Sequence, residues 1–390
     1  MKLASILNVF VIGTLFAIAA PKPIAALTPE EVQEIAEEVT VLIPAEWVNY
    51  SGEREKANGS GSIIAREGNT YTVLTANHVV CGDQNPVCEN SSDLKIVTHD
   101  GKSYEVDNRT IKKLPDVDLA VLEFTSNRNY KLATLGNYPL IDEQYVFASG
   151  WPAPNRYFPK REYFFSVGKV LPKDIMNLLK IFPIELGYDL VYTSLTYGGV
   201  SGGPVFDSKG QVIAVHGMNE KEEIQEYGEE KTLFLPIGFS ASIPIKMFFE
   251  LAPQAGIEVN WQESKTPPDV QKANVEVGIS FVQQFEELTS LESGSSTSID
   301  WANYANRMWR RGMITQALMG YDRALEMNPN FYQAWYGKAL TYTYWRKYDE
   351  ALQAYDRALE MIPDYAENKQ NIVALRQKLV DFLESRANSN

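Results

Sequence analysis

The chain has 390 residues, a length that allows two domains, each large enough to bury a core of its own. Apolar residues make up 45% of the sequence, an ordinary share for a globular protein. The formal net charge is −14, from 36 basic and 50 acidic residues, and no basic cluster stands out. Because nucleic-acid binders need an excess of Lys and Arg to neutralise phosphates, this balance excludes a general nucleic-acid-binding role.

Residues 1–26 have the pattern of a secretory signal peptide. Lys2 gives a positive start, an apolar stretch follows, and "PKPIAA" ends in small residues suited to cleavage near Ala26. We therefore expect a secreted or periplasmic protein with no stable membrane insertion after cleavage. The alternative is an uncleaved anchor, since the stretch is almost long enough to span a bilayer. Whether residues 27–38 form a propeptide stays open.

Residues 27–259 are expected to form one domain. From about residue 39 the sequence predicts many short strands, such as "YTVLTA", "LAVLEF" and "QVIAVHG", separated by turns such as "HDGK" and "DSKG". Strands at this spacing, without helical patterns between them, indicate an all-β barrel or sandwich. The segment "PKDIMNLLKIFP" reads as a short helix or a surface loop.

The chain has two cysteines, Cys81 and Cys88, separated by "GDQNPV". A metal site would need further ligands nearby, and none has suitable spacing, so neither a metal nor a cofactor is predicted. In an exported protein the natural interpretation is a disulfide between these two residues. Such a bond would stiffen the segment just before Cys81.

Residues 260–297 read as a polar linker with a possible helix, and an internal repeat follows. "GYDRALEMNP" and "AYDRALEMIP" begin 34 residues apart, and alanines, aromatics and prolines recur in the same phase. This period and pattern resemble the tetratricopeptide (TPR) repeat. The resemblance implies an all-α domain over residues 298–390, with repeats at 298–331 and 332–365 and a capping helix.

The resemblance also implies that the repeats bind a protein or peptide partner. Trp309, Arg310, Tyr336 and Tyr344 are expected on the inner face, where they would meet that partner. With so few repeats, the alternative is that these side chains pack against the neighbouring domain. The oligomeric state is not indicated.

The stretch "GGVSGGP" suggests a nucleophile at Ser201. A hydroxyl is a poor nucleophile at neutral pH and needs a general base, together with donors for the developing oxyanion. The glycines leave room for the backbone amides of Gly199 and Ser201 to converge as an oxyanion hole. The alternative is a glycine-rich hairpin with a bystander serine.

The base and its orienting acid are predicted earlier in the chain. His78 follows the apolar strand "TVLTA", whereas His99 lies in a turn and is expected to be exposed. In "DVDLAVLEF" we choose Asp118, because it directly precedes a strand and can be buried, whereas Asp116 lies in a proline turn. A carboxylate in this place would orient the imidazole and stabilise its protonated form.

Together, "TANHVV", "DLAVL" and "GVSGGP" resemble the trypsin/chymotrypsin superfamily of serine endopeptidases, in its bacterial style. The resemblance covers about residues 39–257 and implies a chymotrypsin-like double β-barrel, no cofactor and polypeptide substrates. By resemblance His78, Asp118 and Ser201 form the catalytic triad. Many relatives have an acidic residue before the serine, which pairs with a newly freed N-terminus. Here that residue is Val200, so this activation mechanism is not expected.

The same resemblance places the substrate pocket. Leu195 stands at the pocket base, which is acidic in enzymes that cut after Arg or Lys, so that specificity is disfavoured. Thr196 and His216 match positions where glutamyl endopeptidases hold a substrate carboxylate, which suggests a preference for an acidic residue before the cut. In the alternative His216 is a satisfied buried histidine and the pocket takes small apolar residues, as in periplasmic quality-control proteases.

Two functions follow from these observations. The first is an exported serine endopeptidase whose TPR module recruits a substrate or partner. The second is a binding or adaptor protein on a catalytically weak or inactive protease scaffold, with the TPR groove as its working part. The complete set of His78, Asp118 and Ser201 favours the first.

Overall fold

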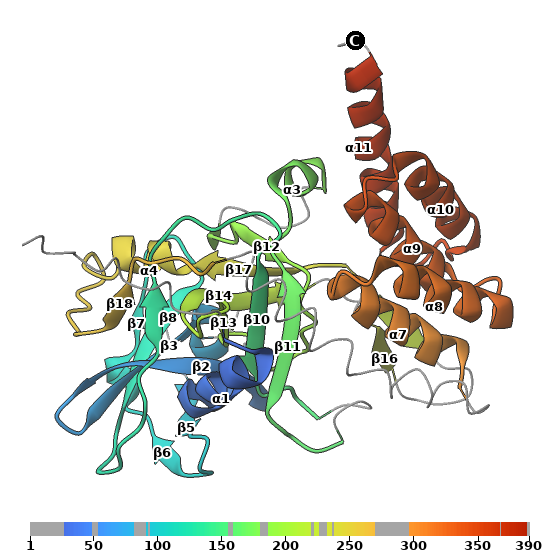
Figure 1. Cartoon of the computed structure of the whole chain (residues 1–390). Helices are drawn as coiled ribbons and strands as arrows, with labels where there is room; N and C mark the ends of the chain where they lie inside the picture. The colour runs from blue at the N-terminus through green and yellow to red at the C-terminus, as the bar shows by residue number, and fades with distance from the viewer. Residues whose placement is uncertain are drawn as a thin grey trace, which may run out of the picture.

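The computed structural model shows a β-rich body with a helical module at its side (Figure 1). The structure describes residues 27–48, 54–81, 91–92, 94–154, 159–179, 186–219, 222–225, 232–235, 238–269, 296–366 and 368–387. In these ranges, no helix combines the length and the apolar character needed to cross a membrane. The predicted signal peptide lies outside the described residues.

The first sheet has eight strands, in the order β6-β5-β1-β2-β3-β8-β7, with β4 paired to β1. The sheet curls into a half-barrel around an apolar interior that includes Ile43, Val73 and Leu122. The strands are β1 Thr40–Val48, β2 Arg54–Glu67, β3 Thr70–Ala76, β4 Ser91–Ser92, β5 Lys95–Val97, β6 Ser103–Glu105, β7 Lys112–Lys113 and β8 Leu119–Thr125. A 3₁₀ turn, η2, covers Asn108–Thr110.

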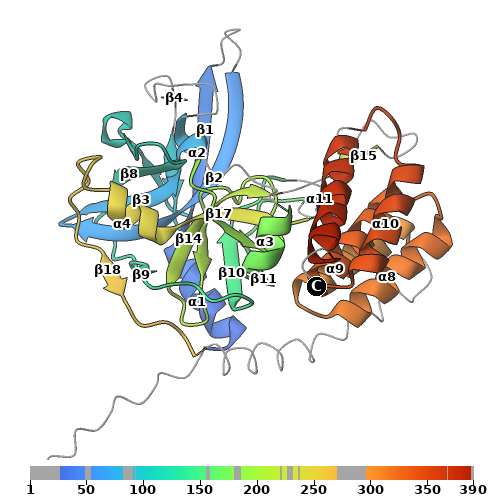
Figure 2. The ribbon, with the colours of Figure 1, turned by 90° about the horizontal axis from the view of Figure 1, so that it is seen from above.

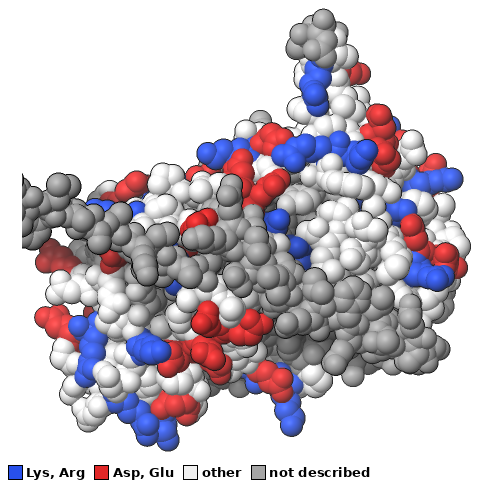
Figure 3. Space-filling model, in the orientation of Figure 1, with Lys and Arg blue, Asp and Glu red and all other residues white. Residues whose placement is uncertain are grey.

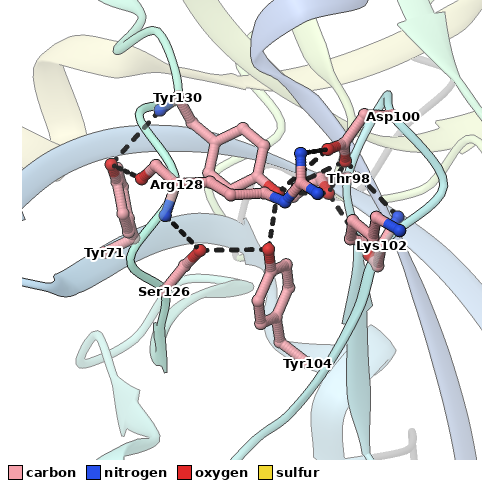
Figure 4. Close-up of polar contacts among 8 residues, drawn as sticks. All are labelled: Tyr71, Thr98, Asp100, Lys102, Tyr104, Ser126, Arg128 and Tyr130. Atoms are coloured by element: carbon pink, nitrogen blue, oxygen red, sulfur yellow. Dashed lines mark hydrogen bonds and ion pairs between the residues drawn. The ribbon is translucent and has the colours of Figure 1, made fainter.

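A cluster of tyrosine hydroxyls ties the loop after β8 to this sheet (Figure 4). Tyr104 and Tyr130 share a hydrogen bond of 2.6 Å, and the hydroxyl of Tyr71 donates to the carbonyl of Arg128 at 2.7 Å. Arg128 also pairs with Asp100 at 3.2 Å. These contacts fix the loop after β8 against the first sheet.

The second sheet also has eight strands. Its main path is β11-β10-β13-β14-β17-β12, and β9 joins β14 to β18. The strands are β9 Thr134–Gly136, β10 Tyr145–Gly150, β11 Phe164–Lys169, β12 Leu190–Tyr192, β13 Pro204–Phe206, β14 Val212–Asn219, β17 Ser240–Pro244 and β18 Gln262–Ser264. A separate hairpin pairs β15 (Glu222–Gln225) with β16 (Thr232–Leu235). The two mainly antiparallel half-barrels share one core, so the expected chymotrypsin-like double barrel is confirmed.

Among the described residues, four shorter helices belong to the β-rich body. They are α1 Pro29–Val39, α2 Asn77–Cys81, α3 Lys173–Leu179 and α4 Ile245–Leu251. A capping box between Thr28 and Glu31 starts α1. The apolar face of α1, with Val32 and Ala36, is buried in the core between the two half-barrels. Residues 27–38 are therefore an integral part of this fold.

The helical module consists of two helix pairs and a final helix: α7 Ser298–Arg310, α8 Ile314–Met327, α9 Tyr332–Tyr344, α10 Tyr348–Met361 and α11 Lys369–Ala387. Helices α7 and α9 begin 34 residues apart, as do α8 and α10, which confirms the repeat period. Small residues lie where the helices cross: a Cβ on Gly337 would come within 2.5 Å of the ring of Tyr321.

The helical module packs directly on the second sheet. Figure 2 shows α11 beside α3, and one apolar cluster combines α3, Val191 and Phe239 with residues of the repeats. Trp309 meets Phe239 edge-on at 5.4 Å between ring centroids. The Nζ of Lys378 on α11 donates to the carbonyl of Leu179 at 2.7 Å. Acidic and basic side chains are interspersed over the face seen in Figure 3.

This packing answers the question about the inner face of the repeats. Trp309, Arg310 and Tyr336 are buried, and Tyr344 is half-buried with its ring 6.1 Å from that of Trp309. In this structure these side chains therefore pack within the module and against the β-rich body, as the alternative interpretation expected.

Candidate active site

Strand register brings His78 and Asp118 together. Strands β3 and β8 are antiparallel, and the last residue of β3, Ala76, lies opposite the first of β8, Leu119. The chain beyond β3 forms α2, which carries His78, and the residue before β8 is Asp118. The amide of Asn77 donates to the carbonyl of Asp118 at 3.2 Å, so the backbone itself holds the two ends side by side.

The carboxylate of Asp118 makes two hydrogen bonds to His78. Its Oδ2 lies 2.6 Å from Nδ1 of the ring, and its Oδ1 accepts the backbone amide of His78 at 2.8 Å. Burial acts to raise the pKa of Asp118, but the hydrogen bonds from His78 and Tyr188 and the charge of His78 outweigh it and hold that pKa below its ordinary value. The ionised carboxylate thus orients the ring through its Nδ1.

Tyr188 is a third member of this cluster that the sequence analysis missed. Its hydroxyl donates to Oδ2 of Asp118, the oxygen that also meets the ring of His78. Gly217 makes room for it, since a Cβ there would come within 2.3 Å of the Tyr188 hydroxyl. Tyr188 and Asp118 are 70 residues apart, and no motif surrounds Tyr188. The sequence feature connected with Tyr188 is Gly217, whose missing side chain leaves space for the tyrosine hydroxyl.

Ser201 lies in the loop between β12 and β13, packed against the end of β3. Its carbonyl accepts the amide of Ser60 at 2.8 Å, and a Cβ on Gly202 would come within 2.1 Å of Oγ1 of Thr75. Thr75 is three residues before His78, so the loop sits beside the His78–Asp118 pair. The hydroxyl of Ser201 donates to the carbonyl of Gly217 at 3.3 Å.

Two backbone amides of the Ser201 loop point away from the hydrogen bonds that the preceding carbonyl groups make. The carbonyl of Gly198 accepts the amide of Ala153 at 2.7 Å, and that of Val200 accepts the amide of Gly203 at 2.9 Å. In a planar trans peptide the N–H points opposite to the C=O, so the amides of Gly199 and Ser201 point away from these partners. Within the described part of the chain, neither amide donates to a protein acceptor. They are free to bind an anion.

Gly199 and Ser60 maintain this conformation. Gly199 has φ +99°, in the left-handed region, and a Cβ there would come within 2.6 Å of the amide nitrogen of Ala153. The hydroxyl of Ser60 donates to the carbonyl of Gly199 at 2.8 Å and accepts the amide of Trp151 at 2.9 Å. Ser60 is a second supporting residue that the sequence analysis did not identify.

The three predicted pocket residues are buried. The carbonyl of Leu195 accepts the hydroxyl of Ser166 at 2.5 Å. Thr196 shares a hydrogen bond of 2.9 Å with the hydroxyl of Ser240 on β17. These bonds tie the segment before Ser201 to the two neighbouring strands, β11 and β17.

His216 is almost completely enclosed, with 1% of its surface exposed. Its Nδ1 shares a hydrogen bond of 2.8 Å with the hydroxyl of Tyr192. Burial, together with the nearby charge of His78, lowers the pKa of His216 to about 3, against a weaker opposing effect of the Ala241 backbone. The ring is therefore neutral at physiological pH, as a satisfied buried histidine would be.

The remaining candidates are placed as follows. His99 and Asp116 are both exposed in turns, Asp116 with φ +58°. Cys81 is buried at the end of α2, three residues after His78, while its predicted partner Cys88 lies outside the described residues. In the part of the chain that the structure describes, no group of three His, Cys, Asp or Glu side chains is placed to hold a metal ion.

Comparison with known proteins agrees with this geometry. The family model for a trypsin-like peptidase domain matches residues 59–215, a range that contains His78, Asp118 and Ser201. The model for a tetratricopeptide repeat matches residues 332–365, the second predicted repeat.

One similar protein is the serine protease Do-like HtrA of Bacillus subtilis, 26% identical over 175 residues. The match covers 44% of this chain and 36% of that protein, so the chain spans about a third of the length of the relative it matches. Residues 59–215 form a trypsin-like peptidase domain, and a tetratricopeptide repeat at residues 332–365 follows it.

Proposed function

We propose that this protein is a serine endopeptidase that cleaves polypeptides through an acyl-enzyme. The observation that carries the proposal is the bound pair of His78 and an ionised Asp118, 2.6 Å apart, beside a serine loop with two outward-facing amides. A general base, its orienting acid, a nucleophile and an oxyanion site are the four parts that acyl transfer requires.

In the first half of the reaction, Oγ of Ser201 attacks the carbonyl carbon of the scissile bond. The hydroxyl first turns from the carbonyl of Gly217 toward Nε2 of His78, which takes its proton. The carbonyl oxygen becomes an oxyanion and is stabilised by the amides of Gly199 and Ser201. His78, now protonated and held by Asp118, gives the proton to the leaving amine as the C–N bond breaks.

In the second half, water replaces the leaving amine. His78 takes a proton from the water as its oxygen attacks the acyl carbon, and the same two amides stabilise the second oxyanion. The ester bond to Ser201 then breaks, and the proton on His78 returns to Oγ. The free enzyme and a new carboxyl terminus result.

A fluorophosphonate label tests this proposal, because it reacts with an activated serine. The folded mature protein is expected to be labelled and to hydrolyse an unfolded protein substrate, and Ser201→Ala is expected to lose both, with the rate falling by at least about 1,000-fold. Ser208→Ala, in the turn after β13, is the matched control and keeps both activities. An unlabelled wild type would overturn the proposal and favour the adaptor function.

For the substrate pocket we propose a preference for an uncharged residue before the cut, over an acidic one. The support is the enclosure and neutrality of His216 and the engagement of Thr196 with Ser240. A buried neutral imidazole gives a carboxylate no counter-charge, so desolvating an acidic side chain there would be costly. A peptide series that varies only this residue is expected to rank Val and Leu above Glu. The reverse order would support the acidic preference.

We also propose export and a disulfide between Cys81 and Cys88. Support comes from the pattern of residues 1–26 and from the closeness of the two cysteines in the sequence. Terminal sequencing of exported protein is expected to begin near Leu27, and a non-reduced digest to contain both cysteines in one linked peptide. A retained leader or two free thiols would contradict these points.

A further inference from the structure

The last residue of α7 makes a reciprocal contact with the peptidase domain. The Nη1 of Arg310 donates to the carbonyl of Thr193 at 3.0 Å, and Oγ1 of Thr193 donates to the carbonyl of Arg310 at 2.7 Å. Both residues are buried; Arg310 exposes only 3% of its surface. The planar guanidinium of Arg310 donates along fixed N–H directions and is buried, so this contact is directional and not a loose surface ion pair.

Thr193 starts the segment that leads to the pocket residues. Leu195 and Thr196 follow within three residues, and Oγ1 of Thr193 also accepts the amide of Lys169 on β11 at 2.8 Å. The next carbonyl, that of Ser194, accepts the hydroxyl of Ser240 at 2.9 Å. Since the bonded residues are consecutive, a shift of Thr193 would be passed on to the pocket.

The residue before Arg310 contacts a second segment that is bonded to the predicted pocket residues. Trp309 packs edge-on against Phe239, which directly precedes Ser240. Ser240 is the residue that shares a hydrogen bond with Thr196. Two consecutive residues of α7 therefore support the two segments, 193–196 and 239–240, that are joined to each other through Ser240.

Two other contacts of the helical module, made by Arg346 and Lys378, involve residues outside these segments. Arg346, in the turn after α9, pairs with Asp174 at 3.2 Å and with Glu143 at 3.6 Å. Lys378 meets the end of α3. These contacts hold the module on the β-rich body through residues other than 193–196 and 239–240. They therefore allow docking of the module to be tested separately from support of the pocket.

From this geometry we propose that Arg310, assisted by Trp309, is a positioning residue that sets the shape of the substrate pocket. The repeat module is then a structural part of substrate selection and not only a recruiting arm. The inference rests on the proposed peptidase function and deepens it. The contact acts on the residues that would meet the substrate side chain, and it touches none of His78, Asp118 or Ser201.

The test compares Arg310→Met with Arg346→Met in the full-length protein. Peptides that vary only the residue before the cut report on the pocket, and a small alkyl fluorophosphonate, which has no such side chain, reports on Ser201 and its base. Because a buried carbonyl loses its donor, Arg310→Met is expected to lower kcat/KM for the best peptide by about tenfold. The loss is expected mainly in KM, and the ratio of kcat/KM between the best and the worst peptide is expected to narrow. The labelling rate is expected to stay within about threefold of that of the wild type.

Arg346→Met is expected to leave both the peptide ratio and the labelling rate within about twofold of the wild type, because it breaks only exposed pairs. Equal effects of the two substitutions would overturn the proposal, as would a loss of labelling that matches the loss of hydrolysis in Arg310→Met. An unlabelled wild type would instead overturn the peptidase function itself.

Thr193→Val keeps the proposal open to test if Arg310→Met does not fold. This substitution removes the hydroxyl that donates to the carbonyl of Arg310 and accepts the amide of Lys169, and it leaves the sequence of the repeats unchanged. It is expected to narrow the peptide ratio in the same direction, with labelling retained. An unchanged ratio in folded Thr193→Val would overturn the proposal.

Discussion

The hydroxyl of Tyr188 donates to the same carboxylate oxygen of Asp118 that meets the ring of His78. Oδ1 accepts the His78 amide, so both oxygens of this buried carboxylate are engaged. A buried carboxylate stays ionised only if it is well hydrogen-bonded. Tyr188 therefore helps to keep Asp118 charged and fixed in position. Because a side chain at position 217 would collide with Tyr188, the glycine at 217 belongs to the same arrangement.

Tyr188→Phe is expected to lower kcat/KM by roughly 3- to 30-fold, since it removes one hydrogen bond to a charged group. The pKa of Asp118 is held low partly by Tyr188 and would rise without it. Activity that needs ionised Asp118 would then be lost at a higher pH as the solution is acidified. The measurement is the profile of kcat/KM against pH, whose acid limb is expected to move to higher pH.

Tyr138→Phe is the matched control, because Tyr138 also donates to a buried carboxylate, that of Asp207, which is not part of the proposed triad. It is expected to lower stability without moving the acid limb. If both variants moved the limb alike, the effect would not come from the triad.

Gly199→Ala is expected to reduce kcat by about 100- to 1,000-fold, the usual cost of losing one oxyanion donor. Alanine tolerates φ +99° poorly, and its Cβ would strike the amide nitrogen of Ala153, so the peptide that aims this donor must turn. Gly198→Ala meets no atom within 4 Å and is the neighbouring control. Single-turnover acylation of both variants measures the difference. Equal rates would show that the amide of Gly199 does not stabilise the oxyanion.

His216 is expected to make the folded state less stable in acid. Its pKa is about 3 in the folded protein, against 6.5 for an unperturbed histidine. Between these values the unfolded chain binds a proton that the folded chain does not, so stability falls as pH falls, by up to about 1.4 kcal/mol per pH unit. Above pH 6.5 this contribution is complete and constant.

Urea unfolding at several pH values measures the slope. His216→Gln is expected to flatten it relative to the wild type, whereas His99→Gln, at an exposed turn, is the control. A slope unaffected by His216→Gln would mean that this ring gains a proton in the folded state as easily as in the unfolded one.

Gly337→Ala is expected to destabilise the protein by about 1–3 kcal/mol, because the new methyl group would overlap the ring of Tyr321 where α8 and α9 cross. Helix propensity alone predicts the opposite, a gain of about 1 kcal/mol. The sign of the change in thermal unfolding therefore tells whether close helix packing or propensity governs this position. A stabilised variant would contradict the packing described for the repeats.

Local patterns made much of this molecule predictable. Turn-separated strands indicated an all-β barrel or sandwich, and the 34-residue period located both helix pairs, because each depends on neighbours in the sequence. The double barrel itself was implied by the resemblance of the motifs to the trypsin/chymotrypsin superfamily. His78 and Asp118 could be chosen because each adjoins a strand end, and antiparallel pairing brings such ends together.

Contacts between distant segments were not predictable in the same way. Tyr188 is 70 residues from Asp118 and stands in no motif. Arg310 was expected on the inner face of the repeats, but its contact with Thr193, 117 residues away, was not expected. The environment of His216 also needed the fold: its sequence neighbours are apolar, but only the structure shows that Tyr192 satisfies its ring. Whether the inner face of the repeats is open depends on how the module docks, which no local pattern records.

The apolar cluster that runs from α3 and Phe239 into the repeats has a consequence for folding. Two modules that share a continuous core cannot melt one after the other without exposing that core to water, so a single cooperative transition is expected. Breaking the chain once between residues 269 and 296 would then leave two pieces that stay together and melt as one. The covalent link between the halves would contribute mainly to how fast they find each other.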